Sequence, residues 1–126
     1  MGLHKQEKTN WDLIRSVEGL KGGLGYLGKL CGALSGGVCL LSLYAGRGPE
    51  DEDPNSQLDP MILELVEWFE ETIGKEYGGI DCDQITASCL DNEELSLTCI
   101  PIVMKISDKV EEILKARGFD MSIGRE

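Results

Sequence analysis

The stretch Cys31-Gly-Ala-Leu-Ser-Gly-Gly-Val-Cys-Leu-Leu-Ser-Leu-Tyr-Ala-Gly46 decides how the chain folds. Its apolar residues lack the alternation typical of a strand, and a glycine follows the last of them, as at the end of many helices. We therefore predict a buried helix over residues 29–45. The apolar run is shorter than the roughly 20 residues that cross a bilayer, and its small residues would let another backbone or a cofactor approach closely.

Two contrasting segments precede this helix. Apolar residues spaced by three and four predict a short helix from Trp11, with Asn10 as its N-cap. These apolar residues are Leu13, Ile14, Val17 and Leu20. Glycine then becomes frequent between residues 19 and 28, which makes a regular element costly, so we expect a loop or a frayed helical stretch beside Cys31.

Two helices are expected after an acidic loop at residues 47–58. The first begins with Asp59 as N-cap and Pro60 in the first turn, and ends at Gly74. Its apolar face consists of Ile62, Leu65, Val66, Phe69 and Ile73. The second is a short helix near residues 80–89, capped by an aspartate and carrying Ile85 and Cys89.

The final helix ends in a basic turn closed by Gly118. Its apolar face consists of Ile102, Val103, Ile106, Val110, Ile113 and Leu114. Asp91 and Glu94 fit a capping box, and Pro101 either lies in the first turn or bends a longer helix that begins near Asp91. We therefore predict an all-α fold, one domain over residues 1–126 with four to six helices around one core and flexible tails at residues 1–9 and 119–126.

The charge of the chain limits its partners. It has 23 acidic and 12 basic residues, a net charge of −11. A phosphate backbone would be repelled, so we expect no nucleic-acid partner. No apolar stretch follows the charged N-terminal residues as a signal peptide requires, so we expect a cytoplasmic protein with no membrane partner, whose thiols are reduced or bound to metal.

The five cysteines are the main candidates for chemistry. Cys31, Cys82 and Cys99 each fall at the start of a predicted helix or at a break in one, where free amide donors and the helix dipole stabilise a thiolate. Cys89, seven residues after Cys82, is expected on the same helical face and is the first candidate for a fourth thiol. Cys39 lies within an apolar pattern and is interpreted as a packed core thiol.

Taken in order, these motifs resemble the C_GCAxxG_C_C family of redox-active proteins over residues 19–117. The motifs are the glycine-rich segment, Cys31-Gly-Ala-Leu-Ser-Gly36, the apolar helix ending near Arg47, Phe69-Glu-Glu71, Ile80-Asp-Cys82 and Cys99. Domains of that family are similar to the N-terminal part of split-Soret cytochromes c, where an iron-sulfur centre is associated with such cysteines. The resemblance implies that Cys31, Cys82 and Cys99 occupy the second, third and fourth cysteine positions of the family.

The chain departs from the family in one respect. The first family cysteine lies upstream of the glycine-rich segment, and residues 1–30 contain no cysteine. Family positions alone therefore cannot supply four thiolates to a cluster. Four alternatives follow. Cys89 or Cys39 substitutes for the missing thiol; a non-cysteine ligand completes the site; a second subunit contributes; or the site has changed or lost its function. The non-cysteine candidates are Asp81, Asp83 and His4.

We therefore expect an electron-transfer or thiol-redox protein with a redox partner protein, rather than a conventional enzyme. In one version Cys31, Cys82, Cys89 and Cys99 hold an iron-sulfur cluster or another metal. In a second version two of them cycle between dithiol and disulfide without a cofactor. A structural zinc site would use the same ligands without redox activity. An alternative of another class is a non-catalytic helical module that forms homo-oligomers or docks a partner, with its cysteines in the core.

Overall fold

A computed structural model describes residues 11–46, 55–87, 89 and 91–119. Its elements are α2 (Trp11–Ser16), η1 (Glu18–Leu20), α3 (Lys21–Leu24), α4 (Gly32–Ala45), α5 (Leu58–Phe69), η2 (Glu70–Gly74), α6 (Lys75–Tyr77), α7 (Cys82–Thr86) and α8 (Asn92–Ala116). Within these ranges strand pairing is limited to one isolated bridge, between Leu30 and Asp81. The all-α prediction is confirmed. None of the helices in the described ranges has the length and apolar character needed to cross a membrane.

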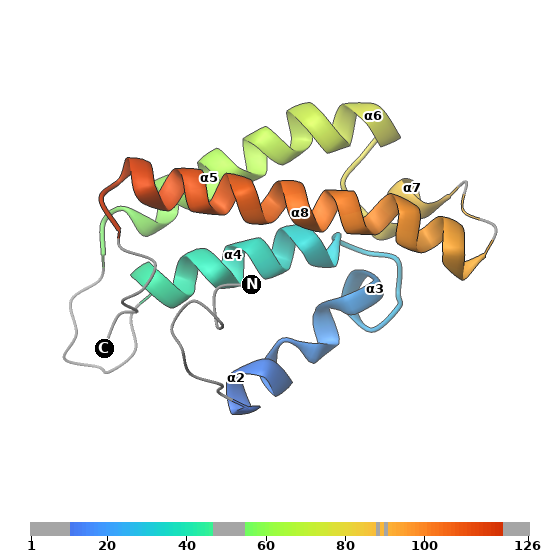
Figure 1. The fold of residues 1–126 in the computed structure, drawn as a ribbon, viewed down its shortest axis with the longest axis horizontal. Coiled ribbons are helices and arrows are strands. Elements are labelled where there is room, and N and C mark those ends of the chain that lie inside the picture. Colours follow the sequence, from blue (N-terminus) through green and yellow to red (C-terminus); the bar gives the residue numbers. More distant parts are fainter. Residues whose placement is uncertain (1–10, 47–54, 88, 90, 120–126) are drawn as a thin grey trace.

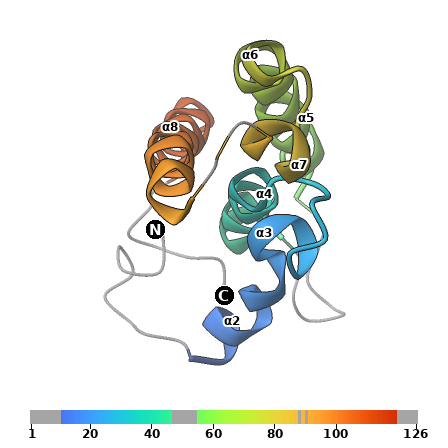
Figure 2. The same cartoon turned by 90° about the vertical axis from the view of Figure 1, so that its right-hand side faces the viewer.

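The core is formed by three helices, with α4 in contact with both α5 and α8 (Figure 1). The end-on view in Figure 2 shows α8 on one side of α4, and α5 with α6 on the other. The buried side chains of these helices are Leu34, Leu40, Leu41, Tyr44, Ala45, Met61, Leu65, Phe69, Ile102, Ile106, Val110, Ile113 and Leu114. At Gly37 the helices come so close that an added Cβ would lie 3.0 Å from the Ile106 side chain. The absence of a side chain at Gly37 therefore allows α4 and α8 to pack this closely.

The helix that begins with α5 is longer than its sequence pattern indicated. Its N-cap is Gln57, so the prediction of Asp59 as the cap is wrong, and Asp59 lies in the first turn. Gly74 does not end the helix, because its φ of −60° is helical and the chain continues through η2 into α6. Gly78, with a φ of +81°, is the residue that ends it. Ile73, just before Gly74, is buried, and Tyr77, three residues after Gly74, packs against the core, so packing on both sides of Gly74 holds the extra turn in place.

Pro101 lies inside the last helix, α8, and not in its first turn. Of the two alternatives, the longer helix that begins near Asp91 is therefore the one observed. Asp91 is the N-cap, and its carboxylate accepts the Glu94 N–H at 2.8 Å, as expected for this cap. The predicted apolar face is confirmed except at Val103, which is 38% exposed because it lies to the side of the buried stripe. Gly118 closes the helix with a φ of +83°, as predicted.

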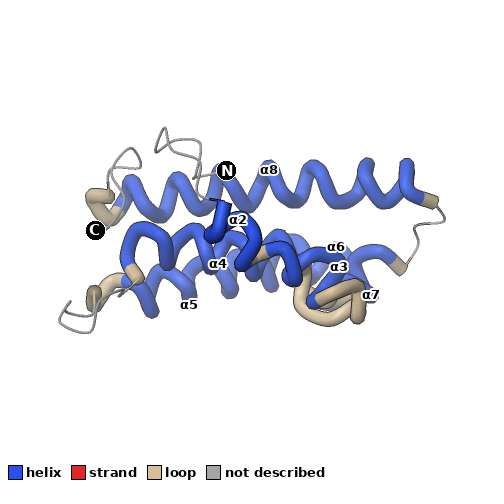
Figure 3. The backbone as a smooth tube through the Cα atoms, turned by 90° about the horizontal axis from the view of Figure 1, so that it is seen from below, coloured by secondary structure: helices blue, strands red, loops and turns tan. Residues whose placement is uncertain are grey.

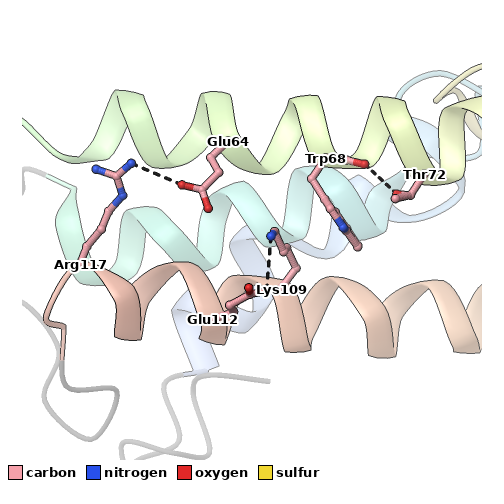
Figure 4. Close-up of polar contacts among 6 residues, drawn as sticks. All are labelled: Glu64, Trp68, Thr72, Lys109, Glu112 and Arg117. Carbon is pink, nitrogen blue, oxygen red and sulfur yellow. Dashed lines mark hydrogen bonds and ion pairs between the residues drawn. The ribbon is translucent and has the colours of Figure 1, made fainter.

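Polar contacts join α8 to α5 along one side of the core. Figure 4 shows the Arg117 guanidinium facing the Glu64 carboxylate, 3.4 Å away, and the Lys109 ammonium bound to Glu112 at 3.3 Å. The same ammonium lies 5.9 Å from the centre of the Trp68 ring, a cation–π contact between the two helices. The Arg117–Glu64 and Lys109–Trp68 contacts supplement the buried apolar face of α8, the helix that carries Cys99.

Several expected boundaries shift by a few residues. The N-terminal helix ends at Ser16 rather than continuing to residue 20, and η1 follows it. The central helix begins at Gly32 rather than at residue 29, because Leu30 is paired with Asp81 in extended structure. Phe119, expected in a flexible tail, packs against the core and donates its N–H to the Leu114 carbonyl. Asn10, the tail at residues 1–9 and most of the acidic loop lie outside the described residues.

Candidate functional site: a cysteine cluster

A short backbone pairing holds the segment before α4 against the start of α7. Leu30 and Asp81 form an antiparallel bridge. The Cys31 N–H donates to the Ile80 carbonyl at 3.1 Å, and the Cys82 N–H donates to the Lys29 carbonyl at 2.6 Å. Two residues that are 51 positions apart in the sequence, Cys31 and Cys82, therefore lie at one small patch of backbone.

The register of this pairing determines how the two thiols face each other. Cys31 and Cys82 each follow the bridged residue of their own segment. Because side chains alternate along extended backbone, both point to the same side of the pairing, as diagonal neighbours. Diagonal neighbours of this kind have Cα atoms about 7–8 Å apart. The two thiols are thus neighbours across the bridge, close enough for Cys31 to act on the Cys82 thiol.

Cys31 is the N-cap of α4 and is only 9% exposed. Its carbonyl accepts the N–H groups of Leu34 and Ser35, both at 3.1 Å, so the backbone of the cysteine starts the helix while its side chain enters the core. The expectation that this cysteine lies at a helix start is confirmed. Gly32, the next residue, lies so close to the Leu20 carbonyl that an added Cβ would be 2.7 Å from it.

Cys82 is the first residue of α7, as expected, and Asp81 caps this helix in a capping box with Gln84. Its pKa nevertheless moves in the opposite direction from the sequence-based expectation. Burial raises the pKa of the Cys82 thiol, the neighbouring thiol of Cys31 and the carboxylate of Asp83 raise it further, and a hydrogen bond from Thr86 lowers it in part. The helix start does not make this cysteine a ready thiolate, because desolvation and negative neighbours outweigh it.

Cys99 lies within α8 rather than at a helix start or break, so that part of the prediction is wrong. The reason is that the helix begins already at Asn92 and continues through Pro101. Burial raises the pKa of the Cys99 thiol, and the thiols of Cys31, Cys82 and Cys89 raise it further. Interactions of this kind require proximity, so four cysteines from separate parts of the chain share one region of the fold.

Cys89 joins this region by a different route from the predicted one. It follows α7 instead of lying on it, because that helix ends at Thr86. Its N–H donates to the Thr86 carbonyl at 2.9 Å, and its Sγ lies 3.5 Å from the Thr98 hydroxyl, one residue before Cys99. Cys89 therefore lies beside the part of α8 that carries Cys99, and the helical face that it was expected to share with Cys82 does not exist.

Cys39 is not a core thiol, contrary to the prediction. It is exposed on α4, while the next two residues, Leu40 and Leu41, supply the buried side chains of that turn. The apolar sequence around it gave no indication of which face would be covered. As the only one of the five cysteines with an exposed side chain, Cys39 provides an internal control for thiol reactivity.

The glycine-rich segment packs directly over the bridge. Five consecutive residues, 22 to 26, have positive φ, including Leu24 at +66° and Tyr26 at +64°. An added Cβ on Gly23 would lie 2.8 Å from the Cys82 Cβ, and one on Gly28 would overlap the Asp83 carboxylate. The glycines are thus needed both for the left-handed backbone and for close approach to the start of α7.

Tyr77, at the end of α6, is a residue of this region to which the sequence pattern assigned no role. Burial raises the pKa of its phenol, followed by the charges of Glu76, Cys89 and Cys99. Its ring packs against the core. In the sequence, a tyrosine followed by two glycines indicates a turn. The structure extends the helix that begins with α5 as far as Tyr77, which places this residue near Cys89 and Cys99.

A metal ion would need at least three ligand side chains that lie close together. Within the described part of the chain, no three cysteine, histidine or acidic side chains converge closely enough to hold one. Asp81 is engaged as a helix cap, and His4 lies outside the described residues. The described residues as arranged therefore do not fit a mononuclear metal site.

A comparison with protein families matches residues 1–113 to the family described as "Putative redox-active protein (C_GCAxxG_C_C)". The chain belongs to this family. Membership of the C_GCAxxG_C_C family covers the bridge, the core and nearly all of α8. Comparisons with curated proteins and with solved structures gave no match. The redox activity in the description of the C_GCAxxG_C_C family is consistent with a candidate site that consists of cysteine thiols.

Proposed function

We propose that this protein transfers electrons by thiol–disulfide exchange, with Cys31 and Cys82 as the pair that forms the disulfide. The observation that carries the proposal is the backbone bridge that makes these two thiols diagonal neighbours. Cys99 and Cys89 are further thiols of the same site. Membership of a redox-active family supports the general class of activity.

The exchange follows from the different burial of the two thiols. Cys82, the less buried of the pair, attacks one sulfur of a disulfide substrate as a thiolate, and the other substrate sulfur leaves as a thiolate. The Cys31 thiolate then attacks Cys82 Sγ, which forms the Cys31–Cys82 disulfide and releases the second substrate sulfur. Two electrons pass to the substrate, and the two protons lost by the cysteines end on the two substrate thiols. A dithiol of a redox partner protein would return the pair to the reduced state.

Formation of the bond requires a small movement. Disulfides have Cα atoms no more than about 7 Å apart, whereas diagonal neighbours lie at or slightly beyond that separation. The glycine-rich segment and the five-residue helix α7 are the two flanking pieces that would adjust. Oxidation is therefore expected to alter residues 28–31 and 80–83 while leaving the α4–α5–α8 core in place.

The raised pKa of Cys82 bears on the direction of electron flow. A dithiol couple is strongly oxidising when the protein stabilises the thiolate of its reduced form. Here burial, Cys31 and Asp83 disfavour the thiolate and raise the pKa of Cys82. The couple is accordingly expected at the reducing end of the range, suited to giving electrons to disulfides rather than to making them.

The test starts from protein purified without oxygen, in which iron and zinc per chain are measured first. The protein is then treated with bis(2-hydroxyethyl) disulfide, and its disulfides are located by peptide mapping without reduction. We expect substoichiometric metal and a Cys31–Cys82 disulfide in the wild type and in Cys39→Ser, and no such bond in Cys31→Ser. Cys39→Ser is the matched control because its thiol is the exposed one.

Three results would contradict the proposal. Stoichiometric iron that is lost in Cys31→Ser would make the site an iron-sulfur or other iron centre. Stoichiometric zinc with the same dependence would make it a structural zinc site. Thiols that react only after unfolding would make the protein a non-catalytic helical module with buried cysteines.

A further inference from the structure

The charge around the cysteine cluster is strongly one-sided. Residues 75–94, which contain α6, α7 and the first turn of α8, have six carboxylates and one lysine, a formal charge of −5. The carboxylates are Glu76, Asp81, Asp83, Asp91, Glu93 and Glu94. The glycine-rich segment on the other side contributes Lys21 and Lys29, but the Lys21 ammonium is bound to Glu18 at 2.6 Å. The surroundings of the thiols are therefore negative on balance.

Several of these carboxylates lie next to the thiols and are not neutralised by a cation of the described chain. Asp83 follows Cys82 directly and interacts with its sulfur. Asp91 is two residues from Cys89, and Glu93 is exposed in the first turn of α8. The ion pairs between described residues do not involve Asp83, Asp91 or Glu93; they use Asp12, Glu18, Glu64, Glu111 and Glu112.

The arrangement of the elements gathers these charges at one end of the molecule. Figure 3 shows α3, α6 and α7 toward the end at which α8 begins. The long core helices extend from there to the opposite end, where Asp59 and Glu112 lie. A molecule approaching the cysteines thus passes through a field set mainly by carboxylates, and such fields change the rate of association of charged ligands by factors of about 10 to 10³.

From this geometry we infer a substrate class: the thiol pair reduces disulfides that carry positive charge in preference to those that carry negative charge. The specificity-determining residues are Asp83, which acts on the Cys82 thiol, and Glu93, which is exposed in the first turn of α8, the helix that carries Cys99. The inference rests on the proposed thiol–disulfide exchange and adds to it the chemical nature of the substrate: a disulfide flanked by ammonium or guanidinium groups, as in a basic peptide segment. An acidic disulfide such as oxidised glutathione is a poor substrate.

The experiment compares three disulfides with the reduced full-length protein. The probes are cystamine, with two positive charges, bis(2-hydroxyethyl) disulfide, which is neutral, and glutathione disulfide, which is anionic. Each second-order rate is divided by the rate of the same disulfide with 2-mercaptoethanol, which removes the intrinsic reactivity of the probe. At low ionic strength we expect the normalised rate for cystamine to exceed that for glutathione disulfide by about 10-fold or more, and the ratio to collapse toward one in about 0.5 M salt.

Variants assign the effect to particular side chains. Asp83→Asn combined with Glu93→Gln is expected to reduce the cystamine-to-glutathione ratio by about 3-fold or more. The matched control, Asp59→Asn combined with Glu112→Gln, removes the same charge from the far end of the bundle and leaves the ratio unchanged. If the first double variant does not fold, Glu93→Gln alone and the salt dependence of the wild type provide the same comparison, because Glu93 is exposed.

The outcomes separate this inference from the proposed function. A wild type that reduces all three disulfides with a normalised ratio near one overturns the substrate preference and leaves the thiol exchange intact. A ratio that falls equally in both double variants overturns the role of Asp83 and Glu93. Failure to reduce any of the three disulfides overturns both proposals.

Discussion

The chemistry of Cys82 depends on the atoms around its sulfur more than on its place in a helix. α7 has only five residues, so its dipole is small, and Cys31 and Asp83 bring negative charge close to the thiol. The hydrogen bond from Thr86 acts in the other direction but is weaker than burial. The result is a thiol that stays protonated at neutral pH and reacts faster as the pH rises.

Asp83→Asn should make the Cys82 thiol easier to deprotonate. Removing the carboxylate takes away one of the causes that raise the pKa of Cys82, so the thiolate fraction at a given pH increases. We expect the pH profile for alkylation of Cys82 by iodoacetamide, followed by mass spectrometry of its peptide, to shift to lower pH. Asp59→Asn is the control and leaves the profile unchanged. A shift to higher pH, or no shift, would show that Asp83 does not act on the thiol.

At the scale of elements, the glycine-rich segment is the least ordinary part of the molecule. Left-handed backbone costs roughly 1–2 kcal/mol per non-glycine residue, and the segment contains two of them, Leu24 and Tyr26. Hydrogen bonds offset this cost: the Gly25 N–H donates to Gly19 at 2.8 Å and the Lys29 N–H to Gly23 at 3.0 Å. The Lys21 ammonium also lies 5.5 Å from the centre of the Tyr26 ring.

A series of alanine substitutions separates backbone strain from close packing. Gly25→Ala meets open space but has a φ of +62°, so it should destabilise the fold by about 1 kcal/mol. Gly23→Ala adds clashes with the Lys29 backbone and the Cys82 side chain to the same strain and should cost more than about 2 kcal/mol. Gly36→Ala, inside α4 with open space around it, should stabilise by about 0.5–1 kcal/mol. Urea denaturation measures all three, and equal effects of Gly23→Ala and Gly25→Ala would argue against close packing of Gly23 on Lys29 and Cys82.

Sequence patterns predict the buried faces of these helices better than they predict where the helices end. The buried faces of α5 and α8 follow from apolar spacing, because a helix must bury the stripe that its sequence makes continuous. Their ends follow less well. Gly74 has the residue type of a helix end, yet Ile73 and Tyr77 are held against the core, so the helix continues through it. A stop signal is a local preference worth about 1 kcal/mol, and burial of a large side chain outweighs it.

At the scale of the whole molecule, the buried thiols couple stability to pH. A thiol whose pKa is raised in the folded state stabilises the fold below its ordinary pKa near 9.0, and that stabilisation is lost as the pH rises through the raised value. Cys82 and Cys99 both belong to this case. The phenol of Tyr77 acts in the same direction at higher pH.

The expected outcome is a free energy of unfolding that falls between pH 8 and about pH 10.5, and falls less in the double variant Cys82→Ala, Cys99→Ala. The measurement is urea denaturation at constant ionic strength under reducing conditions. Cys39→Ala serves as the control, because its exposed thiol should leave the pH dependence of the wild type intact. Parallel curves for the wild type and the double variant would contradict the raised pKa values.

From the sequence alone follow the helical class, the apolar faces of α5 and α8, the cap at Asp91, an aspartate cap for the short helix that begins at Cys82, and the family with its redox character. These features depend on spacing and on contacts between residues close in the chain. Which cysteines meet depends on how the folded chain brings distant segments together. The tertiary structure placed Cys39 on the surface and Cys99 inside a helix, and it paired Cys31 with Cys82 through a bridge between distant segments. Burial and the charge of spatial neighbours, which set the pKa of a thiol, depend on the folded arrangement of all these segments, so no local pattern records them.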